Sequence, residues 1–566
     1  MQFCLRNSKE YKYHKPTNTL STMKKSIKLM AAAILGFAAI ACSSPEKMAE
    51  QAENVLVKCE PAVLEVVAGE INASVSVTYP ADYFHPKAIL EVTPVLVYEG
   101  GEAKMEPFVF QGEKVQDNYQ VIPAAGATIS KKVNFAYAPG MEKSYLEFRG
   151  VVKYKKSAVN LPTKKVADGA NTTYMLVCKD GRVDYKADNY QAIINQTAEG
   201  QVLYTINSST VRNNQLTSQS IKDFQAAIDA IKANERQTIV STDIVAYASP
   251  DGKEDQNAKL SDNRSKSAEK AFGKVTKKHE YDAPVNVKSV GEDWEGFQEL
   301  VGQSDLEDKD LIIRVLSMYS DPAVREKEIK NMSAVYKTLA KEVLPELRRA
   351  RFIANVEFTN YTSEELVDLI NSNIDILDEE ALLRAATLVN ENDKKVAVYK
   401  KAIEKFNSPR AQYNLAVTYI NMNDLAKAKA ELAKVEKDAD VYNAYGVIAL
   451  REGDNKTAAD NFAKAKNEAS VENAAVLDIL AGDYKAAAQK LSGKKTFNAV
   501  LAQILVGNNS AISSLECTCA RGAYLRAVAA ARQGNASAVK AELEKVAKNE
   551  KLAQRAAKDV EFAQFR

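Results

Sequence analysis

The chain has 566 residues, of which 46% are hydrophobic and 27% are charged, so it is long enough for three or four globular domains. Its formal net charge is only +2, and no Lys or Arg run interleaved with aromatic residues follows residue 50. These features exclude a protein that binds nucleic acid through a strong basic field.

Residues 23–41 have the pattern of a secretory signal peptide. Lys24 and Lys25 precede an apolar run that is too short to cross a membrane, and small residues precede Cys42. The sequence Ala-Ile-Ala-Cys resembles the lipobox of bacterial lipoproteins, although Ala39 stands where that family prefers Leu. The resemblance implies that Cys42 becomes the lipidated N-terminus. The alternative is an ordinary cleaved signal followed by an incidental cysteine.

Residues 1–22 are polar and do not suit a position in front of a signal, so we interpret Met23 as the true start. By resemblance to bacterial lipoproteins, the absence of Asp after Cys42 implies export to the outer membrane. The absence of an acidic run, which would resemble the surface-export signals of Bacteroidota lipoproteins, implies the periplasmic face. We therefore expect a lipid-anchored protein of the outer membrane, with residues 42–54 as a polar tether.

Four further cysteines follow the expected lipidation site. An exported compartment permits disulfides, and Cys59–Cys178 is one pairing that the sequence allows. Cys517 and Cys519 have no matching His or Cys pair, so we expect buried thiols and no zinc site there.

The chain then divides into three regions of different pattern. Residues 55–165 contain short alternating or β-branched segments between turn signals, which predict an all-β sandwich, and residues 161–172 read as a linker. Residues 200–360 predict a central α+β domain that opens in β-α-β-α-β order. Its expected strands lie at 201–212, 237–248, 284–291 and 351–358, with a helix at 218–234, a second one from 261, and a helix-rich stretch at 293–350.

Residues 363–566 predict an α-helical solenoid. Turn residues recur at positions 392, 423, 453, 482, 507 and 534, with spacings of 31, 30, 29, 25 and 27 residues. Small residues at 402, 428, 458 and 487 are each followed four positions later by a large apolar residue, at 406, 432, 462 and 491. With "YNLAVTYI" at 413–420 and "NAYGVIAL" at 443–450, the region resembles tetratricopeptide repeats. That resemblance implies a groove that binds a protein partner.

The sequence offers little for catalysis. His85 and His279 have no second His at ligand spacing, and neither a nucleophile elbow nor a phosphate-binding glycine loop is present. We therefore predict no catalytic residues, no metal and no cofactor. Paired carboxylates are read as a solvated face, with an envelope hydrolase kept as a weaker alternative.

A candidate binding site lies in the central domain. The pattern Asn257-x-x-Leu-Ser-x-x-Arg264, after a strand and a turn, resembles the OmpA-like, peptidoglycan-associated domain. The helix-rich stretch at 293–350 departs from the short family pattern and resembles a longer version in Bacteroidota envelope proteins. In the family, an Asp and an Arg clamp diaminopimelate of the peptidoglycan stem peptide through charge-assisted hydrogen bonds. Arg264 and Asn257 match the pattern, Ser249 stands in place of the Asp, and Asp251 is a substitute acid two residues later.

Each of these residues also has a plainer interpretation. Arg264 is then a solvated arginine on a helix surface, Asn257 a turn or cap residue, and 249–252 an ordinary tight turn. The sequence thus predicts a non-enzymatic outer-membrane lipoprotein that binds peptidoglycan and a protein partner. The alternative is an assembly adaptor whose OmpA-like domain no longer binds peptidoglycan.

Overall fold

The computed structural model describes residues 44–277, 279, 281–306 and 308–566. The expected start at Met23, the leader at 23–41 and Cys42 lie outside these residues. Among the described residues, no helix combines the length and the apolar character that crossing a bilayer requires. The chain forms two compact units: residues 44–176 with 480–482 and 495–566, and residues 177–479 with 483–494.

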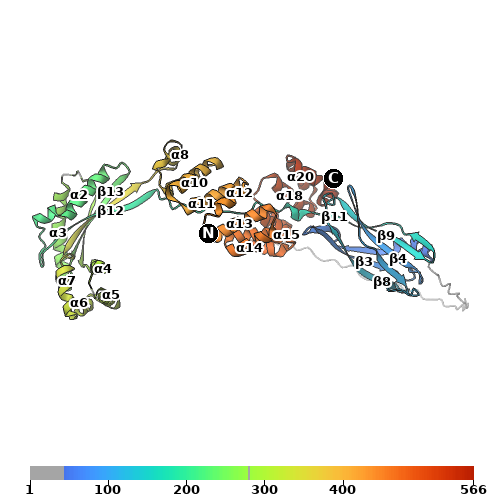
Figure 1. Ribbon diagram of the computed structural model, residues 1–566, viewed down its shortest axis with the longest axis horizontal. Coiled ribbons are helices and arrows are strands. Elements are labelled where there is room, and N and C mark those ends of the chain that lie inside the picture. The colour runs from blue at the N-terminus through green and yellow to red at the C-terminus, as the bar shows by residue number, and fades with distance from the viewer. Residues whose placement is uncertain (1–43, 278, 280, 307) are drawn as a thin grey trace, which may run out of the picture. The chain divides into compact units, whose positions relative to one another are not determined.

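The first unit contains a β domain (Figure 1). The order of its main path is β1-β3-β2-β11-β9-β4-β6-β7; β8 pairs with β3, β5 with β4 and β10 with β9. Side chains of β1, β3 and β8 line an apolar cavity together with side chains of β4, β6 and β9, so the two groups of strands face each other. The strands are β1 (Leu56–Glu60), β2 (Val63–Val67), β3 (Glu70–Tyr79), β4 (Ile89–Tyr98), β5 (Gly101–Lys104), β6 (Phe108–Gly112), β7 (Gln120–Ile122), β8 (Ala127–Ala136), β9 (Ser144–Tyr154), β10 (Ser157–Asn160) and β11 (Lys164–Asn171).

Both ends of this domain differ from the sequence prediction. Residues 161–172 are not a linker, because β11 pairs with β9 and β2 inside the sheet. The segment expected to be a tether contains helix α1 (Pro45–Glu50), which packs against β9 and β10. The Ser44 hydroxyl caps α1 by accepting from the N–H of Lys47, and the Met48 side chain is fully buried. Residues 44–50 are therefore part of the folded domain and not a free tether.

The first unit also contains the last helices of the chain. These are α17 (Phe497–Leu505), α18 (Ala520–Arg532), α19 (Ala536–Val546) and α20 (Glu550–Lys558). Glu561 accepts from Asn171 at 2.7 Å and from Thr173 at 3.0 Å, and it forms an ion pair with Arg532 at 2.6 Å. The predicted solenoid at 363–566 is therefore divided, because its final part packs on the end of β11.

The second unit begins with an α/β domain (Figure 1). The sheet has the order β12-β15-β13-β14, and helices α2 and α3 pack on it through one apolar core that includes Phe224, Phe272 and Phe352. Helices α4–α7 form a separate small core that includes Phe297 and Leu339. The elements are β12 (Ile193–Leu203), α2 (Gln219–Lys232), β13 (Gln237–Ala248), α3 (Glu254–Thr276), β14 (Val285–Glu292), α4 (Trp294–Gln303), α5 (Lys309–Met318), α6 (Pro322–Asn331), α7 (Ser333–Glu342) and β15 (Arg349–Thr359).

This domain has the predicted order of elements with one shifted strand and one longer helix, since α3 begins at Glu254 and not at residue 261. Helix α2 has the expected Ser218 cap and buries the apolar residues that the pattern placed on its inner face. The strand expected at 201–212 lies earlier instead, and it pairs with β15 from Ile193 to Leu203. Asn207 has a positive φ of 54°, a turn conformation that no strand continues through.

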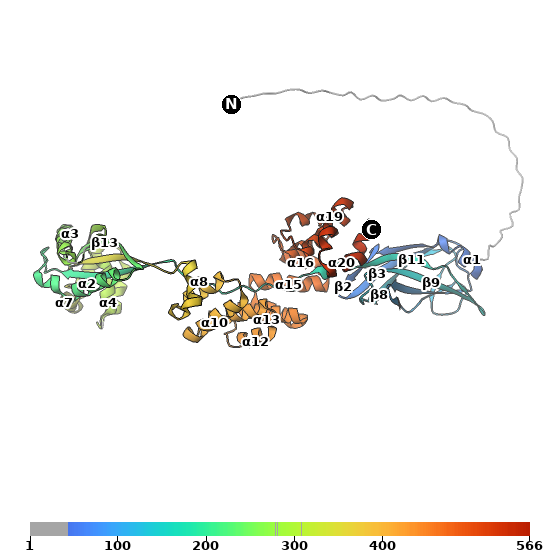
Figure 2. The ribbon, with the colours of Figure 1, turned by 90° about the horizontal axis from the view of Figure 1, so that it is seen from above.

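Helix pairs complete the second unit, and successive helices follow one another in Figure 2. Asp424, Asp454 and Asp483 cap helices as predicted, after residues of positive φ at 423, 453 and 482. Phe406 differs from expectation, since 40% of it is exposed. The helices are α8 (Ser363–Ser372), α9 (Glu379–Leu388), α10 (Asn392–Phe406), α11 (Pro409–Asn421), α12 (Leu425–Leu432), α13 (Ala439–Glu452), α14 (Asn455–Ala465), α15 (Glu468–Ala481) and α16 (Tyr484–Lys490).

The cysteines also differ from the prediction. Cys517 and Cys519 form a disulfide across one intervening residue and are not thiols. Cys59 and Cys178 are not disulfide partners, and the Cys178 thiol donates to the Asp180 carboxylate at 2.9 Å.

Candidate functional site

The residues predicted from the OmpA-like pattern come together in part. The Ser249 hydroxyl donates to the Asp251 carboxylate, and the Asn257 amide donates to the Ser249 carbonyl at 3.2 Å and to Glu292 at 2.9 Å. The turn of Ser249 and Asp251 is thus held against helix α3. Asn257 lies within that helix, whose N-cap is Lys253, so the interpretation of Asn257 as a cap is wrong.

Arg264 forms its hydrogen bonds with backbone carbonyls rather than with this acid. It is 1% exposed, and it donates to the carbonyls of Ser208, Tyr247 and Thr205 at 3.0, 2.9 and 3.4 Å. Burial lowers the pKa of Arg264 to about 10. The interpretation of Arg264 as a solvated surface arginine is therefore wrong. Its guanidinium binds three carbonyls from two stretches of backbone, 205–208 and the end of β13.

A residue that the sequence pattern did not indicate takes the place opposite Asp251. Arg348 donates to the Asp251 carboxylate at 3.0 Å and to the Ser249 hydroxyl at 3.2 Å. The Arg348 and Asp251 side chains are 12% and 17% exposed, so both are largely shielded from water. The acid of the proposed clamp already has a cationic partner within the chain. Peptidoglycan binding by these four residues stays a prediction.

A second candidate site lies on the helix pairs. Residues 178–190, all of which the structure describes, form neither helix nor strand, and none of their side chains is buried. We call this segment the strap. It contacts α15 and α13 near Arg182, α11 near Lys186 and α9 near Asn189, so it runs opposite to the order of the repeats.

Three buried asparagines, one from each of three successive helix pairs, bind the strap backbone. Asn473 accepts from the N–H of Arg182 at 2.7 Å and donates to its carbonyl at 2.8 Å. Asn443 donates to the same carbonyl at 2.9 Å, and Asn473 also donates to the Asn443 amide oxygen. Asn414 binds the N–H and the carbonyl of Lys186 at 2.8 and 2.9 Å. We call Asn414, Asn443 and Asn473 the asparagine ladder.

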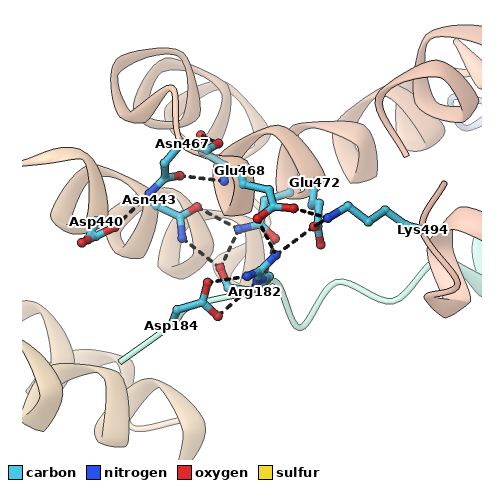
Figure 3. A network of polar contacts seen from close by, with 10 residues as sticks. Arg182, Asp184, Asp440, Asn443, Asn467, Glu468, Glu472 and Lys494 are labelled. Atoms are coloured by element: carbon cyan, nitrogen blue, oxygen red, sulfur yellow. Dashed lines mark hydrogen bonds and ion pairs between the residues drawn. The ribbon is translucent and has the colours of Figure 1, made fainter. Parts of the chain in front are cut away.

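The Arg182 side chain lies in an acidic environment (Figure 3). Its guanidinium donates to Glu472 at 2.9 Å, lies 3.7 Å from Glu468 and pairs with Asp184 of the strap at 2.8 Å. Lys494 also contacts Glu472, at 2.9 Å. Three carboxylates therefore surround one strap cation.

The Lys186 end of the strap combines charge with aromatic contact. The Lys186 ammonium pairs with Asp438 and lies 5.2 Å from the centre of the Tyr413 ring. Tyr185 stacks on Tyr399 at 6.2 Å between ring centres, and its hydroxyl accepts from Asn421 at 3.0 Å. The helix-pair surface beneath the strap, which we call the groove, therefore contacts one basic and one aromatic side chain at adjacent positions.

Glycine is required at position 181 of the strap, directly before Arg182. Gly181 has a φ of +70°, and a Cβ there would lie 2.7 Å from a methyl carbon of Val447 on α13. Both facts exclude a larger residue without movement of the strap.

None of the residues of this second site was predicted from the sequence. A signal was present, because Asn414, Asn443 and Asn473 recur 29 and 30 residues apart inside the repeats. Their polarity was unusual at positions that face neighbouring helices, since buried polar groups need partners. The partners were not predictable, because the strap has no periodic pattern of its own.

Two solved structures that are similar to part of this chain are tetratricopeptide repeat proteins. No family model matches the chain, and no curated protein matches it. A tetratricopeptide repeat protein from Parabacteroides merdae is similar to 34% of this chain and 88% of its own, at 14% identity and a TM-score of 0.27. YrrB, described as a TPR protein with an unusual peptide-binding site, covers 35% of this chain and all of its own, at 18% identity and a TM-score of 0.20.

Proposed function

We propose that this protein is a non-enzymatic scaffold of the cell envelope whose tetratricopeptide-like repeats hold an extended polypeptide by its backbone. The observation that carries the proposal is the asparagine ladder. Asn473 and Asn414 each bind both backbone groups of one residue, Arg182 and Lys186, and these residues lie four positions apart. Among the described residues no cluster of His, Cys, Asp and Glu could hold a metal ion.

Hydrogen exchange of the full chain tests the proposal. We expect the amides of Arg182 and Lys186 to be protected from exchange. Asn414→Ala is expected to raise the exchange rate of the Lys186 amide at least tenfold, because the N–H and the carbonyl of Lys186 both lose the side chain that they bind. Asn461→Ala is the matched control, since Asn461 donates only to Thr457 of its own helix. Unprotected strap amides in the wild type would refute the proposal.

The envelope location rests on the signal pattern and Cys42. We propose that lipid on Cys42 anchors the protein to the periplasmic face of the outer membrane, since several acyl chains bind a bilayer firmly. Cys42→Ser is expected to move the protein from the membrane fraction to the soluble periplasm. Retention of this variant in the membrane would argue against the anchor.

Peptidoglycan binding is the second candidate, favoured by the convergence of Ser249, Asp251 and Asn257. Pull-down of the full chain on purified sacculi tests it with Asp251→Asn, and Asp255→Asn serves as the exposed control on α3. Arg264→Ala is unsuitable, because this buried residue holds the backbone together. Retention of wild type that Asp251→Asn abolishes would support cell-wall binding. Absence of retention supports the adaptor without a wall ligand.

A further inference from the structure

The strap is held without burial of any of its side chains. Its contacts are hydrogen bonds, ion pairs and partly exposed rings, and 40% of the Arg182 side chain is exposed. Each hydrogen bond of this kind contributes about 1 kcal/mol net, and no buried apolar side chain of the strap adds to them, so opening of the strap exposes no core of its own.

The groove beneath the strap binds particular side chains as well as the backbone. The asparagine ladder binds main-chain atoms, which any sequence supplies. Selectivity comes from Glu472 and Glu468 opposite Arg182, and from Asp438 and Tyr413 opposite Lys186. Val447 adds a steric requirement for glycine at the preceding position.

We infer that the strap is an exchangeable internal occupant of this groove. When the strap leaves, the groove binds an extended segment of a partner protein with the pattern Gly-Arg-x-x-Tyr-Lys, and the strap competes with that partner. This inference rests on the proposed function, since the ladder must hold an extended backbone. The partner is assigned by charge complementarity, because two basic side chains four positions apart meet the groove's carboxylates.

A release variant of the full chain tests the inference. Arg182→Glu with Lys186→Glu places like charges against Glu472 and Asp438 and leaves every groove residue intact. The ligand is a fluorescent peptide with the sequence of residues 179–190, and binding is measured by anisotropy. We expect the release variant to bind at least tenfold more tightly than wild type. Asn414→Ala in the release variant is expected to remove the binding.

The matched control peptide carries Glu at both basic positions and is expected not to bind. Equal, weak binding by wild type and release variant would overturn the inference and make the strap a permanent fastening. Strap protection in hydrogen exchange would then still support the proposed function, so the two failures are distinguishable. Sedimentation gives a further outcome: a wild-type dimer that the peptide dissociates would assign the groove to a second copy and overturn the partner assignment.

Discussion

Asn414 binds both backbone polar groups of Lys186, accepting from its N–H at 2.8 Å and donating to its carbonyl at 2.9 Å. One side-chain amide thus does what a neighbouring strand does in a sheet. Asn473 repeats the arrangement at Arg182, and four extended residues cover about 13 Å. The two asparagines therefore bind the main chain of the strap, in addition to the ion pairs that its Arg182 and Lys186 side chains form.

Gly181→Ala is expected to loosen the strap for two separable reasons. The positive φ costs about 1 kcal/mol for a residue with a Cβ, and the methyl group collides with Val447. Hydrogen exchange at Arg182 and Lys186 should rise. Val447→Ala in the same chain should recover the steric part. Gly453→Ala is the control, since Gly453 has a φ of +86° and open space around its Cβ position. Unchanged exchange in Gly181→Ala would contradict the close contact.

Asp438→Asn is expected to weaken the strap in a pH-dependent way. Burial raises the pKa of Asp438, but the Lys186 ammonium and the N–H of Val441 outweigh burial and hold it below the ordinary value of 3.8. A lowered pKa in the folded state means that the stabilisation is present above pH 3.8 and disappears as the pH falls through the lowered pKa. Asparagine keeps the cap on α13 and removes only the charge.

The free energy of unfolding of Asp438→Asn should therefore lie about 0.5 kcal/mol below that of the wild type near pH 7. The difference is small because the ion pair is partly exposed. It should close as the pH falls below 3.8 and through the lowered pKa of Asp438. Thermal melts followed by helical circular dichroism measure this gap. A gap that does not change with pH would show that Lys186 and Asp438 do not pair.

Arg264→Lys is expected to destabilise the α/β domain by ~3 kcal/mol, because one ammonium cannot serve three carbonyls in the geometry of a guanidinium. The single tryptophan of the chain, Trp294, donates from its indole N–H to Glu292 of β14 at 2.8 Å and reports the transition of this domain. Arg212→Lys on the exposed surface is the control. A variant as stable as wild type would return Arg264 to the role of a free ligand-binding residue.

Met48→Ala is expected to lower the stability of the β domain by about 2 kcal/mol or more, because a fully buried side chain leaves a cavity. Differential scanning calorimetry measures the change, with exposed Glu50→Ala on the same helix as control. An unaffected transition would mean that α1 is detached in solution and that the tether prediction holds.

Local signals predicted much of the fold. Helix α2 and strand β13 lie where periodicity and the Ser218 cap placed them. The turns before α12, α14 and α16 were predictable because Asp caps and left-handed residues act within a few positions. Helix α1 carried the signal of a Ser cap followed by Pro, but a six-residue helix depends on the burial of Met48, which lies outside local sequence.

The site was less accessible to prediction because it depends on distant pairs. Arg348 and Asp251 are 97 residues apart, and Asn414 and Lys186 are 228 apart. Neither partner of such a pair shows the other in its own neighbourhood. The repeat period of the ladder could have indicated three equivalent polar positions, but not the segment that occupies them.

The early start of α1 limits how far the β domain could lie from the lipid anchor that we propose at Cys42. The helix begins at Pro45, three residues after Cys42, and three residues span at most about 11 Å when fully extended. If Cys42 carries lipid, the β domain lies close to the lipid headgroups and is not separated from them by a long flexible linker. Its β9 and β10 side, on which α1 packs, would then be the side nearest the membrane.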